Sequence, residues 1–158
     1  MSHYESRAPY IAQHPSALAV YCSDGRFTQS VEELLLSLGE ERLDTLTLPG
    51  GPALLDHTSS SFSSLEVVRD SASFLIRGHS IRRVVLIAHA ECGYYRARFQ
   101  YESAQAMQRR QLNDLAAAAR WIEASHRGVA ALTFYATARE RPNGTRGVVF
   151  EQVGIAPR

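Results

Sequence analysis

Short apolar runs alternate with amphipathic helical patterns along this chain, and this alternation constrains its fold more than any other feature. The apolar runs predict strands at 17–22, 43–48, 84–88, 130–136 and 147–153. Apolar residues at helical spacing predict helices at 31–38, 64–76 and 104–125. Because strands that alternate with helices form a mostly parallel sheet, we predict an α/β fold with helices on both faces of a central sheet.

The two ends of the chain depart from this alternation. Asn143-Gly144 is a two-residue hairpin signal, so the last of about five strands should pair antiparallel at one edge of the sheet. Residues 1–16 are polar and predict an N-terminal arm, whereas residues 17–158 predict a single domain. The arm has no apolar core typical of a secretory signal, so we expect a cytoplasmic protein.

Composition excludes several classes of function. The net charge of +1 gives no reason to expect binding to nucleic acid or to an anionic membrane surface. No apolar run approaches the ~20 residues that a membrane span requires. The two cysteines do not suffice for a disulfide scaffold, which leaves metal ligation, catalysis or core packing as their roles.

Two segments carry candidate chemistry, and each lies where a predicted strand ends. The first is Cys22-Ser23-Asp24-Gly25-Arg26 and the second is His89-Ala90-Glu91-Cys92-Gly93. Ligands bind at the carboxyl ends of the strands in parallel sheets, so both segments should meet at the functional edge. Two thiolates and one imidazole suit Zn²⁺, and three protein ligands leave one position open, as in catalytic zinc sites. Asp24 and Arg26 are close enough to support such a site.

Simpler explanations exist for each residue alone. Either cysteine could be a small buried hydrophobe, and Asp24 with Arg26 could form an ordinary surface ion pair. A thiol enzyme with Cys22 as nucleophile and His89 as base is a further alternative. His57 could shuttle protons, although an exposed loop histidine is the simpler interpretation, and His79 is expected in a surface loop. The coincidence of the two motifs at two strand ends favours the metal site.

The paired motifs Cys-x-Asp-x-Arg and His-x-x-Cys-Gly resemble those of the β-class carbonic anhydrases, and the resemblance extends over residues 17–153. It implies that Cys22, His89 and Cys92 bind zinc, and that Asp24 and Arg26 form a catalytic dyad beside the open position. The implied reaction is reversible hydration of CO₂ to bicarbonate by zinc-bound hydroxide. The resemblance also implies a homodimer or a higher homo-oligomer, and an arm laid across a partner would explain its apolar residues Tyr4, Tyr10 and Ile11.

The chain departs from the family pattern around the motifs but at none of the ligands. Gly25 replaces the usual Ser, and Ala88 replaces the usual Gly before the histidine. Leu48-Pro49-Gly50-Gly51 follows the second strand, and Tyr94 and Tyr95 follow the second motif. These departures affect the substrate pocket, so two alternatives stay open: hydrolysis of a CO₂-like substrate such as carbonyl sulfide or carbon disulfide, and zinc binding without catalysis.

Overall fold

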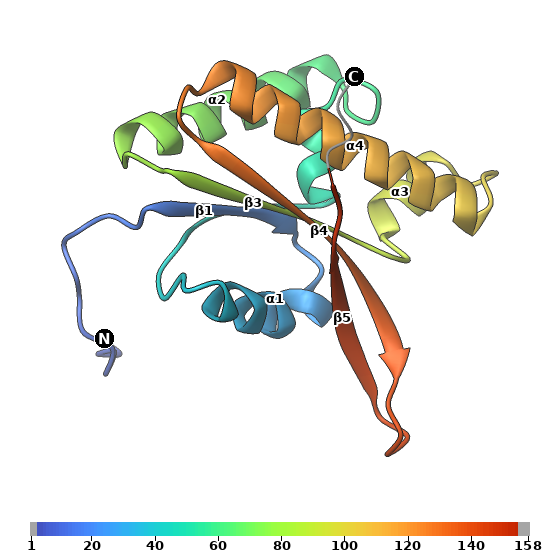
Figure 1. The fold of residues 1–158 in the computed structure, drawn as a ribbon, viewed down its shortest axis with the longest axis horizontal. Helices are drawn as coiled ribbons and strands as arrows, with labels where there is room; N and C mark the ends of the chain where they lie inside the picture. Colours follow the sequence, from blue (N-terminus) through green and yellow to red (C-terminus); the bar gives the residue numbers. More distant parts are fainter. Residues whose placement is uncertain (1–2, 155–158) are drawn as a thin grey trace.

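The computed structural model describes residues 3–154, which fold around a five-stranded sheet in the order β2-β1-β3-β4-β5 (Figure 1). The strands are β1 (Ala17–Cys22), β2 (Asp44–Leu48), β3 (Arg83–His89), β4 (Ala130–Glu140) and β5 (Arg146–Gln152). The first four run parallel, and β5 pairs antiparallel with β4. This arrangement confirms the predicted α/β fold with an antiparallel strand at the C-terminal edge.

Helices cover both faces of the sheet, as predicted (Figure 1). Helix α1 (Gly25–Ser37) packs on one face, whereas α2 (Phe62–Gly78) and α4 (Ala104–Ser125) lie on the other. The short helices η1 (Gly51–Leu55) and α3 (Gly93–Arg98) lie on the same side as α2 and α4. These two short helices come next along the chain after β2 and β3, so they begin near the carboxyl ends of the parallel strands.

The two central strands, β1 and β3, are buried along nearly their whole length. Alternate side chains point to the two helical layers, with Leu18 and Leu86 facing α2 and α4 while Ala19 and Ile87 face α1. Burial on both faces explains why these strands are continuous apolar runs and not alternating patterns. The two strands end at Cys22 and His89.

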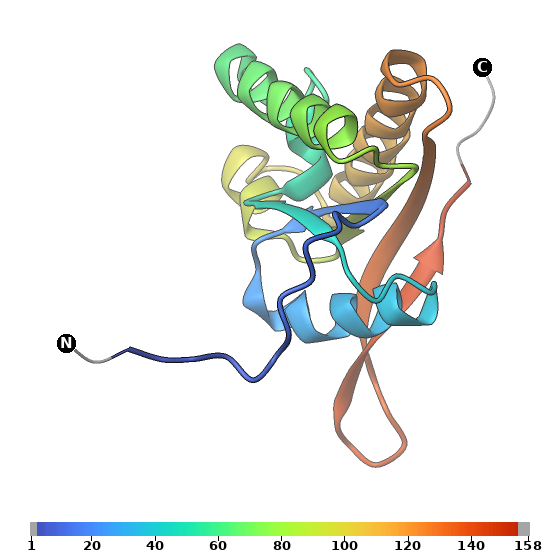
Figure 2. The same cartoon turned by 90° about the vertical axis from the view of Figure 1, so that its left-hand side faces the viewer.

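Some boundaries differ from the predictions. Helix α1 begins at Gly25 and not at residue 31, because the Asp24 side chain accepts a hydrogen bond from the Arg26 backbone N–H and caps the helix. Strand β4 continues to Glu140, so the β4–β5 hairpin projects beyond the sheet (Figures 1 and 2). Helices α3 and η1 were not predicted, since each is too short to show a helical period.

The N-terminal arm reaches away from the sheet and its helices, and residues 3–16 contain no helix or strand (Figure 2). Tyr4 and Tyr10 are 89% and 92% exposed. The end of the arm is held, because Arg42 donates to the Gln13 carbonyl and His14 stacks on His79. Residues 1–2 and 155–158, the outer ends of the predicted arm and domain, lie outside the described residues. No helix within residues 3–154 is both long and apolar enough to span a membrane.

Candidate metal centre

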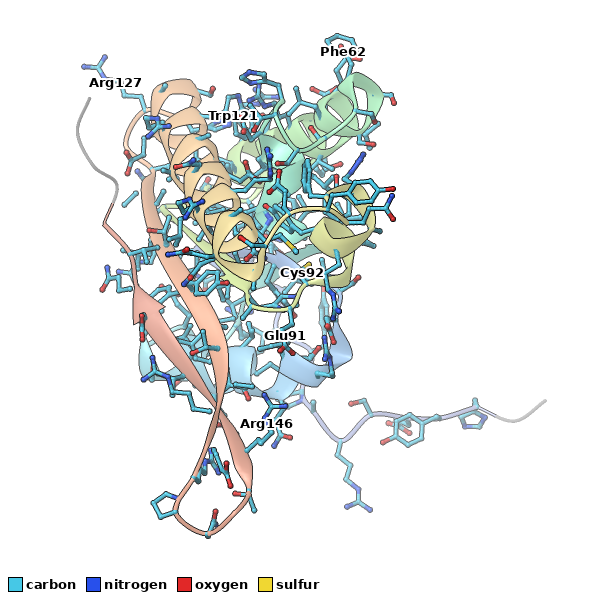
Figure 3. The ribbon with its side chains drawn as sticks, turned by 90° about the vertical axis from the view of Figure 1, so that its right-hand side faces the viewer. Phe62, Glu91, Cys92, Trp121, Arg127 and Arg146 are labelled. Atoms are coloured by element: carbon cyan, nitrogen blue, oxygen red, sulfur yellow. The ribbon has the colours of Figure 1, made fainter. Side chains whose placement is uncertain are left out.

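Neighbouring parallel strands place the candidate ligands at one edge of the sheet. Cys22 is the last residue of β1, and His89 is the last residue of β3. The two strands pair in parallel register up to Tyr21 and Ile87, so their carboxyl ends lie side by side. Cys92 follows three residues after His89, where the chain turns back into α3 (Figure 3). Glu91 has a φ of +57° and makes this sharp turn.

The three candidate ligands converge. One ligand atom from each of Cys22, His89 and Cys92 lies within 4.8 Å of the others, and all three residues are buried. The two sulfur atoms are 3.8 Å apart. A hydrogen bond from Cys92 lowers the pKa of the Cys22 thiol to about 4, and the same bond together with burial raises the pKa of the Cys92 thiol. The lowered pKa of Cys22 favours its thiolate, the form that binds metals.

His89 is oriented as a metal ligand. Its Nδ1 lies 2.8 Å from the Ala90 carbonyl oxygen, an acceptor, so Nδ1 carries the proton and Nε2 holds a free lone pair. Nε2 is buried and has no hydrogen-bond partner among residues 3–154. The Phe27 ring packs on the imidazole with 4.3 Å between ring centroids. Because a buried polar atom without a partner is unfavourable, this nitrogen fits a metal-binding role. Two sulfurs and one imidazole together suit a borderline-soft metal ion.

Asp24 and Arg26 form the predicted pair beside these residues. The Arg26 guanidinium donates to both carboxylate oxygens of Asp24, at 3.0 Å from Nε and 2.6 Å from Nη2. This contact lowers the pKa of Asp24 to about 2. The Asp24 side chain is 20% exposed, whereas that of Arg26 is 63% exposed. Asp24 is therefore ionised at neutral pH. Its carboxylate accepts hydrogen bonds from the Arg26 side chain and from the Arg26 backbone N–H in the first turn of α1.

Residues 12–143 match the family model described as "Putative carbonic anhydrase". The chain belongs to this carbonic anhydrase family. The match includes both motifs and the four parallel strands.

Two curated relatives are uncharacterised proteins of Rickettsia conorii and Rickettsia bellii. Each is 29% identical to this chain, over 82 and 83 residues respectively. These alignments cover 51% of this chain but only 44% and 49% of the relatives. The chain thus aligns with less than half the length of these proteins.

The fold is similar to that of β-carbonic anhydrases of known structure. CafA of Aspergillus fumigatus is 20% identical with a TM-score of 0.53, over 92% of this chain and 78% of CafA. CcaA is 13% identical with a TM-score of 0.53, over 90% of this chain and 79% of CcaA. A tetrameric enzyme of Sordaria macrospora is 12% identical with a TM-score of 0.51, over 90% and 84%. At these identities the likeness shows the fold, and it confirms the β-class architecture of this carbonic anhydrase family member.

The divergent loop after β2 packs against the candidate ligands. The Gly50 N–H donates to the Cys22 sulfur at 3.4 Å. Gly50 has a φ of +86°, and a Cβ there would lie 2.5 Å from the Tyr94 ring. The Tyr94 hydroxyl donates to the Ser59 carbonyl at 2.6 Å, which fixes the ring in place. Gly50 and Tyr94 both depart from the family pattern, and they pack against each other beside Cys22.

A buried polar network under α3 was missed by the sequence analysis. The Tyr95 hydroxyl donates to Asp114, which is 1% exposed, and Thr58 contacts the other oxygen of Asp114 at 3.2 Å. Burial raises the pKa of Asp114. The available signal was that Gln111 and Asp114 occupy helical positions on the apolar face of α4. Polar residues at core positions need buried partners, so both could have been singled out.

The other candidate histidines lie away from the candidate ligands. His57 is exposed, as expected, and its Nδ1 lies 3.2 Å from Asp56. His79 lies in the turn that follows α2, as predicted, but its side chain is only 20% exposed. Its Nδ1 contacts Asp44 at 2.6 Å.

Proposed function

We propose that this protein is a zinc-dependent lyase that reversibly hydrates CO₂ to bicarbonate. The observation that carries the proposal is the convergence of Cys22, His89 and Cys92 on one point, where the buried His89 Nε2 finds no hydrogen-bond partner in the described part of the chain. Membership of the carbonic anhydrase family and the β-class fold support the same reaction.

The donor set fits zinc well. Zn²⁺ prefers sulfur and nitrogen ligands, and three ligands from the protein leave a position for water or substrate. The chemistry that zinc supplies in such a site is the acidification of a water molecule, which becomes a nucleophile toward CO₂ at neutral pH. We propose that Cys22, His89 and Cys92 hold this ion.

The residues around the ligands have separate roles in this proposal. Asp24 stays ionised and accepts a hydrogen bond that orients the nucleophile. Arg26 keeps Asp24 charged and holds its two oxygens, which keeps the carboxylate from turning toward the metal. Phe27 and the Ala90 carbonyl fix the ring plane and the tautomer of His89.

Two cavities lie beside the turn that carries the candidate ligands. The larger, of about 800 Å³, is lined by Cys92 itself together with Glu91. The smaller, of about 390 Å³, is lined by Arg26, Phe27 and Glu91 together with residues of the β4–β5 hairpin such as Arg146 (Figure 3). On the other side of the ligands, Tyr94 and Gly50 are packed together and leave no room for a Cβ. The two arginines favour departure of an anionic product through the smaller cavity.

We further propose a homodimer or a larger homo-oligomer, built from a single zinc-binding domain at residues 17–158 and an arm at residues 1–16. Tyr4 and Tyr10 in the arm are almost fully exposed, and contact with a second copy would bury them. The similar enzymes from Sordaria macrospora are tetrameric. Two reduced cysteines suit a reducing compartment, which is consistent with the cytoplasm.

Metal analysis of purified variants tests the site. Wild-type protein should hold about one zinc per chain. Cys22→Ser, His89→Ala and Cys92→Ser should each lose most of it. His126→Ala is the matched control, because His126 is also a buried histidine but bonds to Ser73. Full zinc occupancy in His89→Ala would remove His89 from the site.

Assays on zinc-loaded protein separate the alternative functions. Turnover of CO₂ exceeding that of carbonyl sulfide and carbon disulfide supports the lyase. Faster hydrolysis of either sulfur compound would indicate a hydrolase of CO₂-like substrates. A protein with full zinc and no turnover of any of the three would be a zinc-binding protein without catalysis.

A further inference from the structure

A glutamine from α4 reaches the turn that carries two of the proposed metal ligands. Gln111 is 2% exposed, and its Nε2 donates to the carbonyl oxygen of His89 at 2.7 Å. Its Oε1 accepts a hydrogen bond from the Tyr135 hydroxyl at 2.9 Å. Both hydrogen bonds are buried, so the nitrogen and the oxygen of the Gln111 amide each have a partner on the buried face of α4.

The hydrogen-bond chemistry permits one orientation of this amide. The His89 carbonyl can only accept, so the NH₂ group of Gln111 must face it. The Gln111 oxygen then faces Tyr135, whose hydroxyl must donate. Burial raises the pKa of Tyr135 to about 12, so this donor keeps its proton at all ordinary pH values. Tyr135 therefore holds Gln111 in the orientation that His89 requires.

The bond to His89 fixes a peptide plane at the metal centre. The peptide unit between His89 and Ala90 is held at both ends, since its C=O accepts from Gln111 and its N–H donates to the Ala136 carbonyl at 2.9 Å. The next carbonyl, that of Ala90, is the acceptor for the His89 Nδ1. A rotation of the fixed peptide would displace that acceptor. The chain then reaches Cys92 through Glu91, whose positive φ gives the turn little stability of its own.

We propose that Gln111, held by Tyr135, is a positioning residue of the metal centre: it sets the backbone of the 89–92 turn and thereby the direction of the His89 imidazole. The proposal rests on the metal centre proposed above. Gln111 bonds to the backbone carbonyl of His89 and not to its imidazole, so its effect on the metal passes through the backbone of His89. This role predicts that removing Gln111 changes zinc affinity and ligand geometry, not protein stability alone.

The test compares Gln111→Leu with Leu115→Ala in the full-length protein. Leucine has a similar size but no polar atom, so Gln111→Leu leaves the His89 carbonyl without its donor. Leu115 lies one turn along the same face of α4 and is equally buried, but it makes no hydrogen bond to the turn. We expect Gln111→Leu to bind zinc roughly 10–100-fold more weakly in competition with a chelator. Leu115→Ala should bind zinc with wild-type affinity.

Two further measurements complete the test. The visible spectrum of Co²⁺-substituted protein reports ligand geometry, and it should change in Gln111→Leu but not in Leu115→Ala. Tyr135→Phe removes a single hydroxyl and should show the same spectral change in weaker form; it decides the question where Gln111→Leu does not fold. Unchanged zinc affinity and an unchanged cobalt spectrum in these variants overturn the positioning role, as does an equal loss of affinity in Leu115→Ala. A wild-type protein that binds no zinc refutes the metal centre itself.

Discussion

Replacing Gly50 by alanine tests how tightly the loop after β2 is fitted against the candidate ligands. Gly39, Gly50 and Gly51 all have positive φ but differ in how much space surrounds them. Gly39 has a φ of +82° and open space around it, whereas a Cβ on Gly50 would lie 2.5 Å from the Tyr94 ring. A Cβ on Gly51, at a φ of +51°, would lie 2.6 Å from the backbone carbonyl carbon of Tyr21, which cannot move away.

The expected losses of stability follow from these contacts. A left-handed backbone conformation costs an alanine about 1–2 kcal/mol, which is the whole expected cost at Gly39. Displacing the Tyr94 ring adds about 1–3 kcal/mol at Gly50, because the ring is fixed by its hydrogen bond to Ser59. Gly51→Ala should be the most damaging, since the obstacle is the backbone of β1.

Urea unfolding of the three variants measures these costs directly. The predicted order of destabilisation is Gly39→Ala, then Gly50→Ala, then Gly51→Ala. A double-mutant cycle isolates the contact with the ring: in a Tyr94→Ala background, Gly50→Ala should cost no more than Gly39→Ala. If Gly50→Ala were as mild as Gly39→Ala in the wild-type background, the Tyr94 ring would not fill the space that we assign to it.

The remaining predictions concern Asp24 and Tyr95. Asp24→Asn should still bind zinc and should still cap α1, since asparagine also caps helices. It should lower the rate of CO₂ hydration, and a wild-type rate would contradict the role of Asp24. Since Arg26 lowers the pKa of Asp24 from 3.8 to about 2, stability from their pairing is complete above pH 3.8 and is lost as the pH falls through 2. Chelator-treated wild type should therefore lose more unfolding free energy than Asp24→Asn between pH 5 and pH 2, by about 1 kcal/mol after solvent screening; equal losses would contradict the pairing. Tyr95→Phe should lower the free energy of unfolding by about 1–3 kcal/mol, because buried Asp114 loses a hydrogen-bond donor. An unchanged urea midpoint would contradict this contribution of the Tyr95 hydroxyl.

The sheet and the candidate ligands were predictable because their signals are local or topological. Strands β1 and β3 are continuous apolar runs. In a chain where strands alternate with helices, such runs indicate strands that are buried on both faces. Parallel strands align their carboxyl ends, so Cys22 and His89 had to lie near each other once the fold class was inferred. The structure brings these residues together as that reasoning predicts.

The surroundings of the ligands were less predictable, because they depend on contacts between distant segments. Asp24 was assigned to the dyad alone, but it also caps α1, seven residues before the first apolar residue of the predicted helix. The packing of Tyr94 on Gly50 joins residues 44 positions apart and has no periodic signature. Gln111 and Asp114 were visible as polar residues on an apolar helix face, although the partners they bond to could not be read from spacing.

Stopped-flow measurement of CO₂ hydration by zinc-loaded protein tests the central claim most directly. The account predicts turnover well above the uncatalysed rate in wild-type protein carrying one zinc per chain, and loss of that turnover in Cys92→Ser. Wild-type protein with one zinc per chain and a rate equal to that of buffer would contradict it.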